Sequence, residues 1–159
     1  MPAKPKPAPK KQSAAADKSQ QLVPYLYYSD VDAALAFLSR AFGFKAIQKY
    51  AGPDGKTNHA AMRLANGAIF MMGCPGAKYK NPKTLGQVTQ GLYITVEDVD
   101  EHYLRAKKAG AKIIDEPADQ FYGDRRYSAE DPEGHHWYFA QHLREVSVRK
   151  VKREMKKGE

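Results

Sequence analysis

The chain repeats one set of landmarks at a nearly constant offset. Asp30 opens an apolar-periodic run that ends at a glycine, and Asp98 opens a matching run 68 positions later. Downstream, Asn66-Gly67 and Glu133-Gly134 each precede a strand-like segment, at an offset of 67. An internal repeat constrains the fold more than any single motif does. It predicts two copies of one supersecondary unit, placed side by side around a cleft.

The first copy has the pattern of a strand, a helix and three more strands. Residues 22–28 are rich in aromatic and branched residues, as strands are. Ser29 or Asp30 then caps a helix whose apolar residues recur at helical spacing, and Gly43 ends it. The three strands are expected at 44–50, 59–64 and 68–73.

The second copy follows the same order. A strand is predicted at 91–96, and a helix over 99–109 begins at the cap Asp98 and stops at Gly110. The remaining strands are expected at 112–114, 125–130 and 136–141, with a loop at 120–122. The fold class is therefore α+β, with two tandem βαβββ modules that form a curved mixed sheet around a central cleft.

These elements define one domain over residues 21–142. Module one spans 22–73 and module two spans 89–142, with a Gly/Pro/Lys-rich linker at 74–88. Residues 1–20 are rich in Pro, Ala and Lys and are predicted to be a disordered basic tail. Residues 143–159 form a basic C-terminal extension, either a surface helix or a frayed end.

The net charge of +8 lies entirely on the two ends of the chain. Residues 1–20 carry five Lys and one Asp, and residues 143–159 carry seven basic and three acidic residues. Residues 21–142 hold fourteen of each sign. A neutral body argues against a nucleic-acid groove in the domain itself. The tails still allow weak, non-specific nucleic-acid contact.

The cysteine count and the hydropathy bear on the compartment. Cys74 is the single cysteine, so an intrachain disulfide is impossible and a reducing setting is expected. No apolar run approaches the ~18–20 residues of a membrane span. The N-terminus lacks the apolar stretch of a secretory signal. The sequence therefore predicts a cytoplasmic protein without membrane contact.

Taken in order, these landmarks resemble the vicinal oxygen chelate superfamily. The resemblance lies in residues 28–32 and 96–100 with their helices, the loop 122–125, and the run 131–137 (DPEGHHW). The superfamily includes glyoxalase I, extradiol dioxygenases, and fosfomycin- and bleomycin-resistance proteins. Over residues 22–142 the resemblance implies a U-shaped sheet with a ligand pocket in its concavity. It also implies a homodimer whose cleft is completed across the interface.

Metal-dependent members bind a divalent cation through a His on the first strand and a Glu on the last strand of each module. Spacing from the landmarks places these positions at Val23, Met71, Gly91 and Tyr138. Val and Gly offer no donor, Met is a soft thioether, and neutral Tyr is a poor ligand. The chain therefore resembles the metal-free, bleomycin-resistance-like branch. We expect no metal and no cofactor, which argues against a metal-dependent glyoxalase or dioxygenase of the usual design.

Strand alternation predicts which side chains line the cleft. Asp124 is expected to orient Arg125 or Arg126 at the cleft mouth, where the arginine would hold an anionic ligand. His136 is a candidate general base. Two alternatives stay open: the tyrosines fill the cleft, or the charged residues of this loop form a structural salt bridge. The predicted ligand-binding residues are Tyr25, Tyr27, Met71, Tyr93, Tyr122, Arg125, His136 and Tyr138.

The leading interpretation is a protein that binds a small, partly aromatic or apolar organic ligand in this cleft without a metal. A second is a lyase or isomerase that uses His136 and pocket tyrosines, or a metal held by non-standard ligands. A third is an interaction protein held on polyanions by its basic tails. The sequence leaves the identity of the ligand open.

Overall fold

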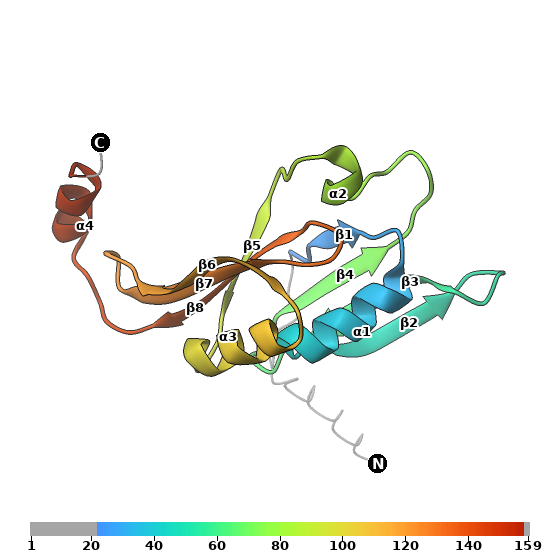
Figure 1. The fold of residues 1–159 in the computed structure, drawn as a ribbon, viewed down its shortest axis with the longest axis horizontal. Coiled ribbons are helices and arrows are strands. Elements are labelled where there is room, and N and C mark those ends of the chain that lie inside the picture. The colour runs from blue at the N-terminus through green and yellow to red at the C-terminus, as the bar shows by residue number, and fades with distance from the viewer. Residues whose placement is uncertain (1–21, 158–159) are drawn as a thin grey trace, which may run out of the picture.

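The computed structural model describes residues 22–157 as two modules, each a four-stranded mixed sheet with one helix against it (Figure 1). The strand order is β1-β4-β3-β2 in module one and β5-β8-β7-β6 in module two. In each module the first and last strands pair in parallel, and the other pairs are antiparallel. The predicted tandem βαβββ architecture is thus confirmed. The predicted tail at 1–20 falls outside the described residues.

The elements of module one agree with the predicted ones to within a few residues at their ends, and in module two β6 is longer than predicted. The bounds are β1 (Tyr25–Tyr27), α1 (Val31–Phe42), β2 (Lys45–Ala51), β3 (Thr57–Arg63), β4 (Ile69–Gly73), α2 (Pro82–Leu85), β5 (Gly91–Thr95), α3 (Val99–Lys108), β6 (Lys112–Asp119), β7 (Asp124–Glu130), β8 (His136–His142) and α4 (Val148–Met155).

The two long helices begin where the capping residues predicted. The Asp30 carboxylate accepts a hydrogen bond from the Ala33 backbone N–H at 2.9 Å, and the Asp98 carboxylate accepts one from Glu101 N–H at 2.9 Å. Each bond satisfies a donor that the first helical turn leaves unpaired. Gly43 follows α1 at φ 74°, a conformation that favours glycine.

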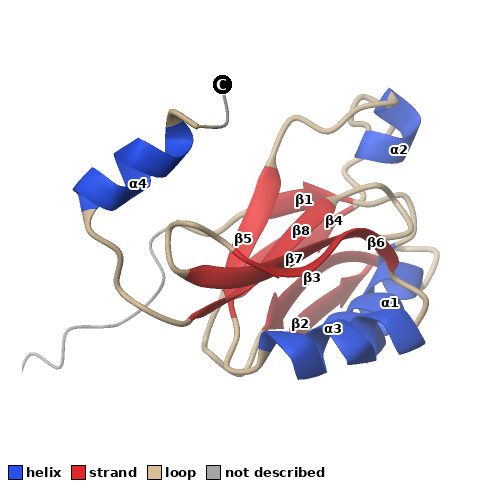
Figure 2. Cartoon of the chain, turned by 60° about the vertical axis from the view of Figure 1, so that its left-hand side comes forward, coloured by secondary structure: helices blue, strands red, loops and turns tan. Residues whose placement is uncertain are grey.

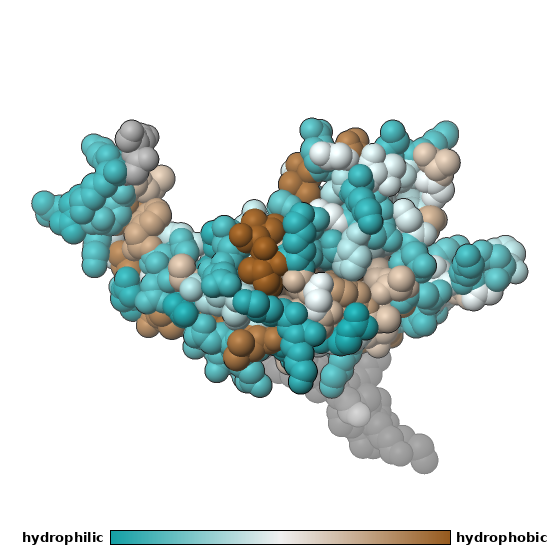
Figure 3. Space-filling view, in the orientation of Figure 1, coloured by the Kyte–Doolittle hydropathy of each residue, from teal (hydrophilic) through white to brown (hydrophobic). Residues whose placement is uncertain are grey.

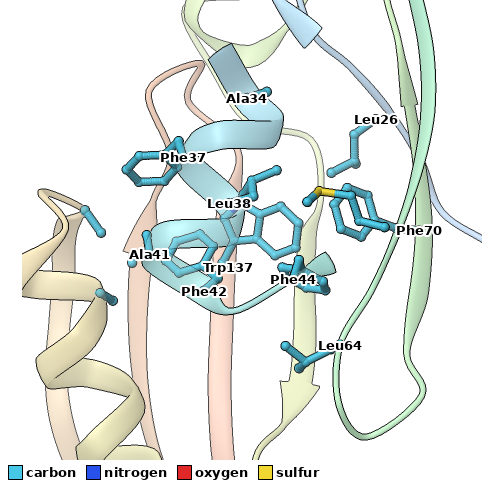
Figure 4. Packing of buried hydrophobic residues seen from close by; sticks show 14 of the residues in the cluster. Leu26, Ala34, Phe37, Leu38, Ala41, Phe42, Phe44, Leu64, Phe70 and Trp137 are labelled. Carbon is cyan, nitrogen blue, oxygen red and sulfur yellow. The ribbon is translucent and has the colours of Figure 1, made fainter. Parts of the chain in front are cut away.

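The modules share one core, with α1 lying beside α3 (Figure 2). Trp137 of β8 is fully buried, and three aromatic rings of module one surround it (Figure 4). Its ring centroid lies 5.6 Å from those of Phe42 and Phe44 and 5.3 Å from that of Phe70. Helix-facing side chains of the two sheets therefore pack on each other, and neither module has a core of its own.

The turn before β8 also ties the modules together. Buried Asp131 accepts hydrogen bonds from the Tyr28 hydroxyl at 2.6 Å and from Trp137 Nε1 at 3.1 Å. The Glu133 carboxylate accepts bonds from the backbone N–H groups of Ser29 at 2.6 Å and Asp30 at 2.9 Å. Module two thus supplies acceptors for the start of α1 in module one.

His102 of α3 is a buried histidine with a structural role. Its Nε2 lies 3.1 Å from the Phe42 carbonyl, which can only accept, so Nε2 carries the proton. Its Nδ1 then accepts a hydrogen bond from the Tyr127 hydroxyl at 2.7 Å. Burial, with a smaller effect from the charge of Arg105, lowers the pKa of His102 to about 4, although the hydrogen bond to the Phe42 carbonyl opposes this shift. The imidazole is therefore neutral at pH 7.

This burial makes the stability of the protein depend on pH. The pKa of His102 is about 4 in the folded chain, and an unfolded histidine has a pKa of ~6.5, so the unfolded chain binds more protons between these values. We expect the free energy of unfolding to fall by up to about 3 kcal/mol as the pH drops from ~6.5 to ~4. His142, whose pKa is raised in the folded state, acts in the opposite direction. Urea titrations of wild type and His102→Gln across this range isolate the contribution of His102; parallel pH profiles would contradict it.

Two segments differ from the sequence-based prediction, and a third decides between the two alternatives given for the C-terminal extension. The linker contains a short helix, α2, with Asn81 as its N-cap. Strand β6 continues to Asp119 because it pairs with β7 through two irregularities in register. The C-terminal extension forms α4, which stands away from the body in both views (Figures 1 and 2). No helix within residues 22–157 has the length and hydropathy to cross a membrane; a cytoplasmic location stays a prediction.

Candidate functional site

Strand alternation separates two faces of each sheet as predicted. Residues expected under the helices are buried, including Leu26, Phe70 and Phe139. Residues expected on the opposite, cleft-facing side are partly exposed: Tyr25 keeps 39% and Tyr93 keeps 49% of its surface in contact with solvent. The predicted side chains therefore line open surfaces in the single chain.

In module one the cleft-facing side carries a group of aromatic rings. Tyr25 Oη lies 3.0 Å from His59 Nδ1, and its ring centroid lies 5.8 Å from that of Tyr27. Tyr27 packs against Tyr79 of the linker, with centroids 4.8 Å apart. Met71 is paired with Tyr25 in the sheet and is half-buried. Sequence reasoning missed His59 and Tyr79. His59 was only the first residue of a predicted strand, and nothing in the sequence marks Tyr79.

In module two the corresponding face combines aromatic and charged groups. The rings of Tyr93 and Tyr138 stack with centroids 6.5 Å apart, and the Tyr93 hydroxyl donates to Asp124 at 2.6 Å. The Arg126 guanidinium lies 5.1 Å from the centre of the Tyr138 ring. Burial, the hydrogen bond to Asp124 and contact with Tyr122 raise the pKa of Tyr93, so this phenol stays neutral.

Asp124 joins this group to the end of β8. Partial burial favours the neutral carboxyl, but hydrogen bonds from Tyr93 and from His142 at 2.9 Å outweigh it and lower the pKa of Asp124. The same hydrogen bond to Asp124 raises the pKa of His142, against its desolvation, and Glu145 adds to the effect. Asp124 therefore orients Tyr93 and His142, whereas an arginine, Arg125 or Arg126, was predicted.

His136 lies at a different hollow. Its Nε2 is 3.5 Å from Glu130 Oε2, which also pairs with Lys112 at 3.1 Å. These three side chains line a hollow of about 730 Å³ beneath α2, together with Lys83 and Gln87 of the linker. Glu130 can therefore accept a proton beside the imidazole, and the lysines of the hollow can attract an anion there.

Tyr25 and Tyr27 line a second hollow of about 360 Å³ with His135 and, from the linker, Lys80, Leu85 and Gln90. Pro82 and Gln87 line both hollows, so the linker lies between them. The predicted site residues are thus brought together in groups: Tyr25 with Tyr27 and Met71, Tyr93 with Tyr122 and Tyr138, and His136 with Glu130.

Arg125 lies on the other face of the sheet from these groups. Its guanidinium binds Asp100 of α3 through Nε at 3.0 Å and Nη2 at 3.0 Å, and Asp119 through Nη1 at 2.9 Å. Arg125 therefore does not face the cleft as a ligand-binding residue would. Its contacts agree with the alternative of a structural salt bridge. The arginine on the cleft-facing side is Arg126, one position later.

The four positions that correspond to the metal ligands of metal-dependent members do not form a cation site in this chain. A Cβ atom at Gly91 would lie 2.4 Å from Cε2 of Tyr138, so the phenol ring occupies the space where a ligand side chain would stand. Met71 pairs with Tyr25 and presents only a thioether. Within residues 22–157, no three His, Cys, Asp or Glu side chains are grouped to hold a metal ion. These residues do not fit the cation of the metal-dependent enzymes.

The family model for the Glyoxalase/Bleomycin resistance protein/Dioxygenase superfamily matches residues 19–139. The chain belongs to this superfamily. The protein Rv0887c of Mycobacterium tuberculosis is 37% identical over 140 residues, which cover 84% of this chain and 81% of that protein. TioX of Micromonospora sp. ML1 has 35% identity and a TM-score of 0.65, with 78% of this chain and 99% of TioX covered.

More distant members share the fold. A glyoxalase-related enzyme of Fulvimarina pelagi has 20% identity and a TM-score of 0.58, over 77% of this chain and 88% of its own. The superfamily includes both binding proteins and enzymes, so membership fixes the architecture and leaves the activity to the side chains of this chain. Helix α4 lies beyond residue 139, where the family model ends.

Proposed function

We propose that this superfamily member binds a small, partly aromatic or apolar organic ligand on its cleft-facing tyrosines, without the metal used by glyoxalase I. The observation that carries the proposal is the exchange at the four metal positions, where Val23, Met71, Gly91 and Tyr138 stand in place of ligands. Exposed aromatic rings with few polar partners suit a flat organic molecule. Sequestering such a molecule needs neither an acid nor a base.

The homodimer expected from the resemblance would suit this function. Tyr25 and Tyr93 keep 39% and 49% of their surface exposed, and contiguous exposed aromatic surface commonly marks an interface or a ligand site. A second copy laid over these faces would enclose them. Light scattering of the purified chain is expected to give a mass near twice 17.8 kDa.

Analysis of the purified, dialysed protein tests the proposal directly. We expect less than about 0.1 equivalents of Zn, Ni, Fe or Mn, because the donors present suit none of them. We also expect native mass spectrometry to detect a co-purifying organic compound, lost when the protein is denatured. Stoichiometric metal that survives dialysis would contradict a metal-free function.

The second candidate is a lyase or isomerase, favoured by the His136–Glu130 pair. A carboxylate at 3.5 Å can orient an imidazole for proton transfer, and the adjoining hollow admits a substrate. The third candidate, contact with polyanions, is favoured by the basic side chains of α4, since Arg149, Lys152 and Arg153 line one hollow. Much of the surface of α4 is hydrophilic in Figure 3. If retention on DNA-cellulose is lost as the salt is raised, before the salt reaches its physiological concentration, the binding comes from the charges of the tails alone.

A further inference from the structure

Arg126 is placed unlike the other paired cations of module two. Its side chain lies on the cleft-facing side of β7, over the ring of Tyr138, with 26% of its surface exposed. Its Nη2 is 3.8 Å from the Asp115 carboxylate, beyond hydrogen-bond distance. Within residues 22–157, Arg126 Nε is the buried side-chain nitrogen or oxygen that has no hydrogen-bond partner. Arg126 therefore forms an ion pair with Asp115 but no hydrogen bond to it, and its buried Nε has no acceptor.

The carboxylates near Arg126 accept their hydrogen bonds from other groups. Asp115 accepts the Ser128 hydroxyl at 2.5 Å, and Asp124 accepts Tyr93 and His142. Buried donors in proteins almost always have partners, and a charged donor without one is costly. The neighbouring arginine, Arg125, shows the usual outcome, with its nitrogens bound by two aspartates. An external acceptor would complete the environment of Arg126.

We propose that Arg126 binds the carboxylate of an aromatic ligand whose ring packs against Tyr93 and Tyr138. The planar guanidinium matches a carboxylate with two parallel hydrogen bonds, and the stacked phenols offer an apolar surface next to it. The inference rests on the proposed function and narrows it to aromatic acids. Of the two arginines expected to hold an anion, it assigns this role to Arg126, because Arg125 lies on the opposite face of the sheet and pairs with Asp100 and Asp119.

The test compares two matched probes on the full chain, 2-naphthoate and its neutral amide, 2-naphthamide, by titration calorimetry. Wild type is expected to bind 2-naphthoate about 10- to 100-fold more tightly, because hydrogen bonds to a charged group discriminate on this scale. Arg126→Met should remove this preference while leaving the affinity for 2-naphthamide within about twofold. Arg126→Lys keeps the charge without the planar fork and should recover part of the preference.

Arg125→Met is the control, since it removes the same charge one residue away on the opposite face. It should keep the preference for 2-naphthoate. Equal binding of the two probes by wild type, or an unchanged preference in Arg126→Met, would overturn the role of Arg126 and leave the proposed function standing. Failure of both probes to bind wild type would contradict the aromatic ligand site itself. Thermal melts check that each variant folds. If Arg126→Met does not fold, the comparison of wild type with Arg126→Lys tests the proposal, since a preference for 2-naphthoate that is unchanged in Arg126→Lys would contradict it.

Discussion

Replacing Trp137 by alanine is expected to lower the free energy of unfolding by about 3–5 kcal/mol, the range for large-to-small changes of a buried aromatic residue. The indole is fully buried and contacts Phe42, Phe44 and Phe70 of module one. Its removal leaves a cavity between the modules and takes away one of the two donors to Asp131 Oδ2, the other being the Tyr28 hydroxyl. A single site therefore weakens both halves of the core.

Urea denaturation followed by far-UV circular dichroism measures this effect, with Leu104→Ala as the matched control. Leu104 lies on α3 with 63% of its surface exposed, so its truncation should change the stability by less than about 0.5 kcal/mol. We also expect Trp137→Ala to melt about 6–20 °C below wild type. Similar midpoints for Trp137→Ala and Leu104→Ala would show that the aromatic cluster is not the shared core.

Replacing Asp131 by alanine is expected to cost about 3–5 kcal/mol, because it breaks a buried hydrogen-bond network. The carboxylate accepts from the Tyr28 hydroxyl, Trp137 Nε1 and the backbone N–H groups of Glu133 and His135. Asp131 is only 3% exposed, so water does not replace the lost acceptor freely. All four donors would be left without this partner at the junction of the modules.

Asp54→Ala provides the comparison for this change. Asp54 lies in an exposed turn and accepts one bond, from Lys56 N–H, so its loss should cost less than about 1 kcal/mol. Asp131→Asn, which keeps one acceptor oxygen, should fall between the two alanine variants. The role of Asp131 would be refuted by a urea midpoint in Asp131→Ala that matches that of Asp54→Ala.

Local signals in the sequence were sufficient for most of the fold. Asp30, Asp98 and Gly43 act through hydrogen bonds within one helical turn, so their roles can be read from neighbouring residues. The offset between repeats then placed the strands. Alternation along them separated core residues such as Leu26 from the exposed Tyr25 and Tyr93. These features depend on short spacings that a sequence displays directly.

The candidate site was harder to predict because it depends on tertiary placement. Extending β7 back to Asp124 fixed its register against β8, which put Arg125 toward α3 and Arg126 toward Tyr138. A difference of one residue reverses the face of a strand side chain. The contact of Tyr79 with Tyr27 depends on the path of the linker, which no motif specifies. The separation into two hollows likewise follows from where α2 lies.

The Glu133 carboxylate accepts hydrogen bonds from the backbone N–H groups of Ser29 and Asp30, just before α1, although more than one hundred residues separate them in the sequence. During synthesis on the ribosome, the leading half of the chain emerges without this acceptor and without the indole that fills its core. That half must then wait in an incomplete state until the trailing half arrives. We therefore expect that neither half of the repeat folds when it is produced without the other.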